Sequence, residues 1–145
     1  MKTEPRINLS SLQEGMPLPK LTKEIRQENI NLYAKASKDF NPIHIDEEFA
    51  RKTPLGGTIA HGMLVLAYIA EMMTGAFGED WITGGKLSVR FKSPARPGDT
   101  VTVSGKVRKI ERTGGKTVVH CDALCLNQSG ETIIAGESSV ALQNR

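Results

Sequence analysis

YAKASKDFNPIHIDEEFARKTPLGGTIAHGMLVLAYIAEMM, residues Tyr33–Met73, is the stretch around which the rest of the chain is organised. It holds two of the three histidines, His44 and His61, and Asp39 lies five residues before the first of them. Gly62 stands at the start of the longest apolar run. Groups able to transfer protons therefore lie beside one hydrophobic helix, which is the combination that a site for an apolar substrate needs.

Length and composition indicate an ordinary globular protein. The chain has 145 residues, of which 39% are hydrophobic, enough for a real core. We expect a single domain over residues 1–145, with the polar residues 1–10 loosely ordered. The 19 basic and 16 acidic residues leave a formal charge of +3, a near balance that does not indicate a nucleic-acid-binding protein.

The cysteines and the apolar segments bear on where the protein works. Cys121 and Cys125 are four residues apart on a predicted strand, hence about 13 Å apart, which is too far for a disulfide. We expect both to be small core residues. Residues 1–15 lack the apolar segment of a signal peptide, and the run 63–73 is too short to span a bilayer. The expectation is a soluble, cytoplasmic protein without membrane contacts.

Two helices are predicted in the first part of the central stretch. Apolar residues recur at helical spacing over residues 27–39 and predict an amphipathic helix. It should end before Pro42, because proline disfavours the α region for Asn41. Asp46 can then cap a short helix over residues 47–52, whose acidic start suits the helix dipole.

A third helix is predicted over residues 60–74, where Glu71 is the only charged side chain. A helix without a polar face must be surrounded by protein, and a sheet is the simplest cover. Gly75 and Gly78 are expected to end this helix.

Alternating hydrophobicity predicts strands elsewhere. In residues 86–92, for example, Leu87, Val89 and Phe91 should face the core. Short turns between successive strands predict an antiparallel meander, with a bulge at Gly105. The fold class is therefore α+β, a five-stranded antiparallel sheet wrapped around a central buried helix. The predicted strands are 21–25, 86–92, 100–110, 116–126 and 132–142.

Three motifs resemble one known family. The pattern YAxxSxDxNPxHxD at Tyr33–Asp46, AHGM at Ala60–Met63 and FKSPARPGDTV at Phe91–Val101 are similar to the (R)-specific enoyl-CoA hydratase or MaoC-like dehydratase family. The resemblance covers about Leu12–Leu142. It implies a hot-dog fold, a homodimer or higher homo-oligomer, and a hydro-lyase of fatty acid metabolism. The implied reaction is reversible addition of water to trans-2-enoyl-CoA, giving (R)-3-hydroxyacyl-CoA.

The resemblance also implies a catalytic site, in which Asp39, His44 and Gly62 match the family's catalytic residues. Hydration of a conjugated thioester needs a proton acceptor, a proton donor for the α-carbon and a donor to the acyl oxygen. Asp39 and His44 flank the Asn41-Pro42 turn, and Gly62 offers a backbone N–H at a helix start. No metal and no redox cofactor is expected, because the thioester already acidifies its α-proton.

Other residues are candidates for binding the acyl-CoA thioester. Asn41 is expected with equal weight either to form the turn before Pro42 or to contact the substrate or His44. Most side chains of the helix predicted over residues 60–74 are expected to belong to the core, and a few are expected to shape an acyl tunnel. Lys86, Arg90, Lys92 and Arg96 form a basic edge for the phosphates of coenzyme A or, residue by residue, a solvated strand face. The candidate substrate-binding residues are Asn41, Met63, Leu66, Ala70, Arg90 and Lys92.

Each polar residue also has a purely structural interpretation. Taken singly, Asp39 and His44 would be a turn former and a surface histidine, and only the surrounding motif favours catalysis. Asp46 is expected to cap a helix, His61 to orient its loop, and His120 to face outward. No group of three ligands at plausible metal-binding spacing is visible in the sequence.

Three other functions compete with enoyl-CoA hydration. The first is dehydration of (3R)-hydroxyacyl groups on acyl carrier protein. The second is a hot-dog thioesterase, in which Asp39 would activate water against the carbonyl. The third is a non-catalytic acyl-CoA-binding subunit, against which the presence of Asp39, His44 and Gly62 argues.

Overall fold

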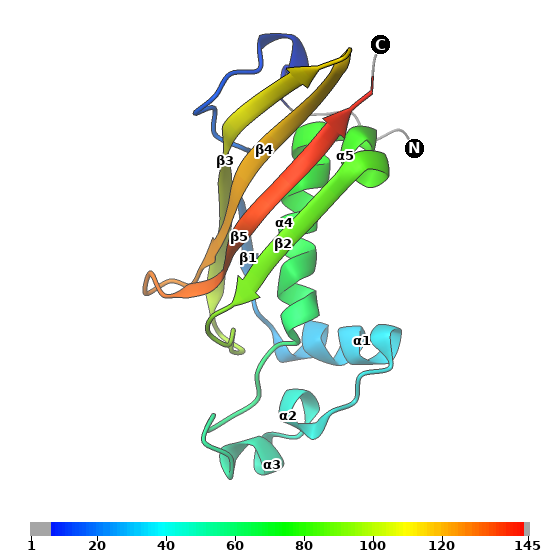
Figure 1. Cartoon of the computed structure of the whole chain (residues 1–145). Coiled ribbons are helices and arrows are strands. Elements are labelled where there is room, and N and C mark those ends of the chain that lie inside the picture. Colours follow the sequence, from blue (N-terminus) through cyan, green and yellow to red (C-terminus); the bar gives the residue numbers. More distant parts are fainter. Residues whose placement is uncertain (1–6, 144–145) are drawn as a thin grey trace.

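An antiparallel sheet of five strands curls around one long helix, α4 (Gly62–Phe77), in the computed structural model, which describes residues 7–143 (Figure 1). This confirms the predicted fold class. The strands are β1 (Leu21–Glu24), β2 (Gly85–Phe91), β3 (Thr100–Thr113), β4 (Lys116–Leu126) and β5 (Thr132–Leu142).

Three short helical elements lie apart from the sheet, below the start of α4 (Figure 1). They are α1 (Gln27–Ser37), α2 (Pro42–Ile45) and α3 (Glu47–Arg51). Two of them match the predicted helices at 27–39 and 47–52, whereas α2 and α5 (Glu79–Gly84) were not expected. A 3₁₀ turn, Leu9–Ser11, begins within the segment 1–10 that was expected to be loosely ordered, and Leu9 packs against the core. Residues 1–6 of that segment lie outside the described part.

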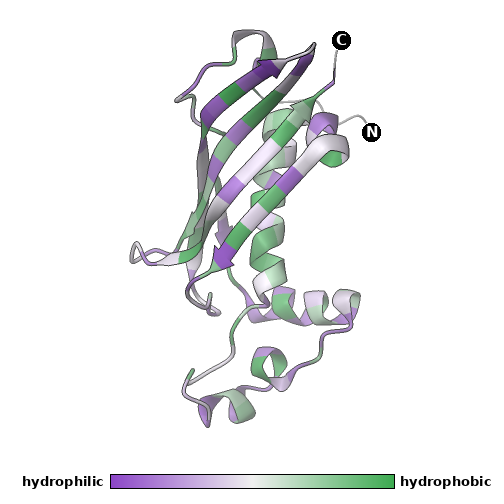
Figure 2. Ribbon diagram, in the orientation of Figure 1, coloured by the Kyte–Doolittle hydropathy of each residue, from purple (hydrophilic) through white to green (hydrophobic). Residues whose placement is uncertain are grey.

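Helix α4 buries one face against the sheet. Its apolar sequence makes it almost uniformly hydrophobic along its length (Figure 2). The buried face contributes side chains that are at most 1% exposed, while Met63 is 57% exposed and Ala67 and Glu71 also face outward. The helix is thus covered on one side by this chain, rather than on all sides as its composition predicted. The buried residues are Val65, Ile69, Met72, Met73, Ala76 and Phe77.

The end of α4 differs from the sequence-based expectation. The helix continues through Gly75 and ends at Phe77, where Gly78 adopts a φ of 63° and donates its N–H to Thr74. A positive φ is easily reached by glycine, so Gly78 alone ends the helix.

No helix in residues 7–143 combines the length and the hydrophobicity that crossing a membrane requires.

The strand order is β1-β3-β4-β5-β2, which corrects the predicted meander. Strands β3, β4 and β5 do pair in sequence, through the turn at Gly114-Gly115 and a second turn at 127–131. Strand β2, however, pairs with β5 and not with its successor β3, and β1 pairs with β3. Strand β2 therefore forms one edge of the sheet.

The bulge in β3 lies at Arg108, between Val107 and Lys109, and not at Gly105 as predicted. Gly105 keeps regular pairing with Ala123, but a Cβ there would collide with the carbonyl oxygen of Asp122. The glycine is needed for close backbone approach rather than for a bulge.

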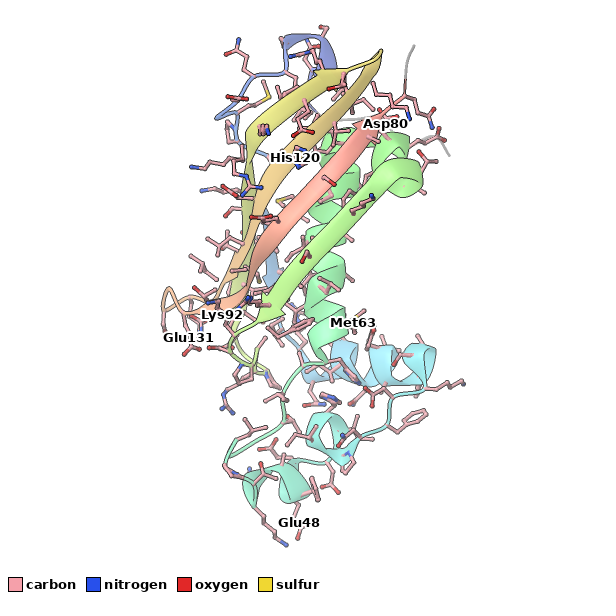
Figure 3. All side chains as sticks on the ribbon, viewed as in Figure 1. Glu48, Met63, Asp80, Lys92, His120 and Glu131 are labelled. Atoms are coloured by element: carbon pink, nitrogen blue, oxygen red, sulfur yellow. The ribbon has the colours of Figure 1, made fainter. Side chains whose placement is uncertain are left out.

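The face of β4 that points away from the core carries polar side chains. His120 lies on that face as expected, with its Nε2 3.5 Å from the carboxylate of Glu111 (Figure 3). The alternating residues Cys121 and Cys125 are buried in the core as free cysteines, as predicted. Burial raises the pKa of both thiols to about 11, so they are poor nucleophiles at neutral pH.

Candidate functional site

A tight turn between α1 and α2 presents the candidate catalytic carboxylate. Lys38 ends α1 in the left-handed region, with a φ of 64°, and turns the chain away from the helix axis. The carboxylate of Asp39 then accepts the N–H of Asn41 at 3.2 Å. Its side chain remains 52% exposed. Local turn chemistry therefore holds Asp39 in place while leaving one carboxylate oxygen, Oδ2, free of that bond.

Asn41 and Pro42 start the helix that carries His44. The Asn41 side chain accepts the N–H of Ile43 at 3.1 Å, and Pro42 occupies the first helical position. This is a standard N-cap arrangement, because proline has no N–H to leave unsatisfied there. The side chain of Asn41 is thus engaged in capping α2, which supports the turn-forming alternative over substrate contact.

His44 has a defined orientation. Its Nδ1 lies 2.8 Å from the carbonyl oxygen of Ile59, so Nδ1 carries the proton in the neutral ring. The remaining nitrogen, Nε2, lies 3.9 Å from Oδ2 of Asp39. That separation exceeds direct hydrogen-bonding range. The His44 side chain is only 12% exposed, so the structure places the edge of a largely buried imidazole opposite an exposed carboxylate.

His61 contacts both of these residues. Its ring stacks on that of His44, with centroids 3.8 Å apart, and its Nε2 lies 3.0 Å from the backbone carbonyl of Asp39. The ring of Tyr33 also contacts His61 in an edge-to-face arrangement, with centroids 4.8 Å apart. The residue is 2% exposed, and its Nδ1 has no hydrogen-bond partner within residues 7–143. His61 orients its loop, as predicted, and also braces the Asp39–His44 pair.

Asp39, His44 and His61 form the one group of potential metal ligands found among the described residues, with ligand atoms within 4.8 Å of one another. The sequence did not reveal this group, because His61 is far from the other two along the chain. Zn²⁺ would have to lie about 2.0–2.1 Å from both imidazoles and in both ring planes. Rings stacked at 24° have planes that meet well beyond that distance. The geometry suits proton transfer better than chelation.

Gly62 is the first residue of α4 and follows His61 directly. Its N–H has no helical acceptor and lies at the positive end of the helix dipole. A Cβ built on Gly62 would lie 2.9 Å from Cε1 of Phe91, so the space over this residue is already limited by that ring. Phe91, which its strand pattern placed in the core, is 54% exposed beside Gly62 instead.

A largely apolar pocket with a volume of about 330 Å³ opens beside Gly62. Phe91, Lys92 and Ile133 line it, together with Ile59, whose carbonyl binds His44. Both Met63, near α1, and Lys92, near the end of β2, lie at this end of the molecule (Figure 3).

The remaining predicted binding residues lie elsewhere. Met63, Leu66 and Ala70 lie on α4 and do not line the pocket; Met63 is exposed and the other two are partly buried. Arg90 is exposed on β2 and does not line the pocket either. Arg96, another residue of the predicted basic edge, donates a hydrogen bond from its guanidinium to the carbonyl oxygen of Leu55, 2.5 Å away. Lys92 is therefore the predicted basic residue that lines the same pocket as Gly62.

Comparisons with known proteins identify the family. Residues 9–124 match the family described as the MaoC-like domain. The chain is 33% identical over 125 residues to an (R)-specific enoyl-CoA hydratase of Rhodospirillum rubrum, covering 86% of this chain and 85% of the relative. It is 30% identical over 125 residues to a mitochondrial 3-hydroxyacyl-[acyl-carrier-protein] dehydratase of Arabidopsis thaliana, covering 85% and 74% respectively.

A solved structure extends the comparison to three dimensions. The (R)-hydratase of A. caviae involved in PHA biosynthesis superimposes with a TM-score of 0.78 at 28% identity, covering 92% of this chain and 98% of the other. The named relatives are hydratases and dehydratases, which are hydro-lyases. The fold and the sequence comparisons thus confirm the family resemblance noted from the sequence.

Proposed function

Because the chain belongs to the MaoC-like dehydratase family, a family of hydro-lyases, we propose that it adds water reversibly to trans-2-enoyl-CoA, giving (R)-3-hydroxyacyl-CoA. The observation that carries this proposal is the relation between Asp39 and His44. Oδ2 of Asp39 and Nε2 of His44 face each other at 3.9 Å, and in the neutral ring the bond from Nδ1 to Ile59 leaves Nε2 without a proton. Both groups accept hydrogen bonds, so they can orient one donor between them.

A water molecule is the donor that fits this pair. If the water oxygen lies about 2.8 Å from both Asp39 Oδ2 and His44 Nε2, the angle between these two acceptors at the water oxygen is about 90°. This is close to the angle at which one water molecule can donate both of its hydrogens. Both hydrogens would then be directed at protein acceptors. The oxygen lone pairs are left to attack the β-carbon of an enoyl thioester.

The proton balance of hydration then follows. The water oxygen bonds to the β-carbon, the pair accepts one water proton, and electron density moves to the thioester oxygen as an enolate. The pair returns a proton to the α-carbon, which restores the thioester and the resting protonation state. We assign Asp39 as base and acid, with His44 as its partner.

Gly62 is proposed to stabilise the enolate oxygen. Its backbone N–H points from the positive end of α4 and is unused within the helix, and the absence of a side chain lets an acyl oxygen approach. Such donors are among the largest contributors to acyl chemistry, where the loss of one costs about 10²–10³ in rate.

The apolar pocket and Lys92 support a thioester as substrate. Phe91, Val65 and Ile133 provide apolar surface for an acyl group next to Gly62, and Lys92 provides a cation at the same pocket for a phosphate of coenzyme A. Leu66 and Ala70, on another face of α4, remain candidates for controlling acyl length. No metal or redox cofactor takes part in this scheme.

A second candidate is dehydration of (3R)-hydroxyacyl groups carried on acyl carrier protein. The similarity to the Arabidopsis thaliana acyl-carrier-protein dehydratase favours it, since that relative is nearly as similar as the CoA-dependent hydratase. The two differ in the carrier and not in the bond chemistry. Assaying one acyl chain on both carriers separates them, because equal or greater activity on the carrier protein would demote the CoA proposal.

We also propose that the protein acts as a homodimer or higher homo-oligomer. Met63 at 57%, Phe91 at 54% and Ile82 at 65% leave large apolar side chains exposed on α4, β2 and α5. Strand β2 has β5 as its single neighbour in the described sheet, so its other edge has backbone groups available for pairing. Contact with a second copy would cover both features.

The direct test of the proposed function is a screen of trans-2-enoyl-CoA substrates of increasing acyl length, with the chirality of the product determined. We expect loss of the conjugated absorbance and an (R)-3-hydroxyacyl product. Release of free thiol from saturated acyl-CoA would favour a thioesterase instead. Binding of all these thioesters without turnover would favour a non-catalytic acyl-CoA-binding subunit.

A further inference from the structure

His44 is held not only through its ring but also through its backbone. The carbonyl oxygen of His44 accepts a hydrogen bond from Nε2 of Gln27 at 2.7 Å. Gln27 is the first residue of α1 and lies 17 residues earlier in the chain. The side chain of one helix therefore fixes the position of another helix, the one that carries the candidate catalytic imidazole.

The amide of Gln27 has almost no freedom. The second hydrogen of its Nε2 is directed at Oδ1 of Asn31, 2.9 Å away, and its Oε1 accepts the hydroxyl of Thr58 at 2.7 Å. The carbonyl oxygen of His44 can only accept, so the NH₂ group of Gln27 must face it, and Oε1 then faces the hydroxyl of Thr58. Without that hydroxyl, Oε1 loses its donor, and the amide loses one of the three bonds that hold it against His44.

Thr58 is itself fixed. It is 4% exposed, and its backbone N–H donates to the carboxylate of Glu47 at 3.1 Å. Its hydroxyl oxygen lies 2.7 Å from Oε1 of Gln27 and 3.1 Å from the carboxylate of Glu47, so its one proton has two acceptors, of which Gln27 is the nearer. The N–H therefore anchors Thr58 to α3, and the hydroxyl anchors it to α1.

Thr58 immediately precedes Ile59, the residue that fixes the tautomer of His44. Ile59 donates its N–H to the carbonyl of Ile43 at 3.1 Å and accepts Nδ1–H of His44 at 2.8 Å. The segment 58–59 is thus bonded to α2 at two points and, through Gln27, at a third. These bonds form a closed ring of contacts around His44, here called the Gln27–Thr58 clamp.

We propose that Gln27 and Thr58 are positioning residues for His44, which keep its Nδ1–H on Ile59 and its Nε2 toward Asp39. Neither touches the proposed water or the acyl group, so their effect is exerted through His44. The inference rests on the proposed function for its catalytic consequence. Its structural part, the fixed imidazole, can be measured without any substrate.

The structural part is tested by the exchange of the imidazole proton with water. The chain has three histidines, so ¹⁵N-labelled protein gives a simple imidazole spectrum in which a His44→Asn variant identifies the His44 signal. We expect a protected Nδ1–H in the wild type. Thr58→Val, which is nearly isosteric, and Gln27→Met should each speed its exchange by about tenfold, the effect of losing one net hydrogen bond.

The catalytic part is tested in the same variants with an enoyl-CoA substrate. Thr58→Val and Gln27→Met should lower kcat by about tenfold while KM stays within about twofold, because substrate contacts are unchanged. Thr58→Ser keeps the hydroxyl and should restore both exchange protection and kcat. Thr83→Val is the matched control, since the Thr83 hydroxyl also donates to one group, Glu79, and accepts from another, Gln143, far from His44 along the chain.

The outcomes are distinguishable. Unchanged proton exchange in Thr58→Val and Gln27→Met overturns the clamp, and so do equal losses in Thr83→Val. Faster exchange with unchanged kcat overturns the positioning role in catalysis. If the wild type hydrates no enoyl thioester, the proposed function fails while the exchange data still decide whether the clamp exists. Should Thr58→Val not fold, the partly exposed Gln27 carries the test through Gln27→Met.

Discussion

The imidazole of His61 lies flat against that of His44, with ring centroids 3.8 Å apart and an angle of 24° between the planes. The same ring donates Nε2–H to the backbone carbonyl of Asp39 at 3.0 Å. One buried residue thus contacts both members of the proposed catalytic pair. A histidine can do this because it combines a flat face with an N–H donor at its edge.

We therefore predict that His61→Phe, which keeps the stacking face and loses the donor, lowers kcat by about tenfold, the cost of about one hydrogen bond. His61→Asn keeps a donor but loses the stacking face, and should lower kcat and the melting temperature together. Steady-state kinetics and thermal unfolding of both variants measure these effects. His120→Phe on the outer face of the sheet is the control, and a wild-type kcat in His61→Phe would contradict the prediction.

Gly62→Ala tests the space needed for the acyl oxygen. A methyl group there would lie 2.9 Å from Cε1 of Phe91, a ring that is half exposed and able to shift. We expect thermal stability to change little, since alanine favours a helix, but kcat/KM to fall by about tenfold or more. Adding Phe91→Ala relieves the contact within the protein. Full recovery of kcat/KM in that double variant would indicate that the ring, and not the substrate, was displaced.

Acid pH should destabilise the fold through three carboxylates. The backbone N–H of Thr58 holds the pKa of Glu47 below its ordinary value of 4.5, and Lys109 and Arg108 do the same for the pKa values of Glu111 and Glu137. A folded-state pKa below the unfolded one means that the unfolded chain binds more protons in this range. The stabilisation is therefore complete above about pH 4.5 and is lost as the pH falls through the folded-state values.

Urea unfolding between neutral pH and about pH 3 measures this loss. Glu47→Gln should flatten the dependence of the unfolding free energy on pH. Glu48→Gln serves as the control, because it removes the adjacent carboxylate, whose ion-pair partner, Lys52, lies 4.0 Å away on the same helix. Identical pH slopes for the wild type and Glu47→Gln would contradict the assignment.

The exposed apolar residues on α4 and β2 predict self-association. Light scattering after size exclusion should give the mass of two or more chains at micromolar concentration. The physical reason is that Met63 and Phe91 are each more than half exposed and the edge of β2 is available for pairing. A monomer that remains fully active would contradict the proposal.

Local sequence signals predicted the elements well because each depends on nearby residues. Helical spacing identified α1 and most of α4, and Asp46 caps α3 through Phe49 as expected. Strand neighbours were less predictable, since alternation shows that β2 is a strand but not which edge it joins. Residues 92–99 connect β2 to a strand, β3, that is not its neighbour in the sheet, and β2 pairs with β5 instead.

The residues of the candidate site also fall into those that the sequence could predict and those that it could not. Asp39 and His44 could be predicted because a short turn brings them together, and the motif around them is distinctive. The contacts of His61, Gln27 and Ile59 could not, because their bonds to the pair involve backbone carbonyls, which every residue possesses. A sequence does not mark which carbonyl a distant side chain will bind.

The central claim is that Asp39 and His44 together hold the attacking water. The most direct measurement is the loss of conjugated absorbance of crotonyl-CoA with the wild type, Asp39→Asn and His44→Asn, using Asp122→Asn on the outer face as control. We predict rapid loss with the wild type and the control, and a decrease of about 10² or more in each site variant at unchanged thermal stability. Undiminished hydration by either site variant would contradict the account, as would a wild type inert toward short, medium and branched enoyl-CoA.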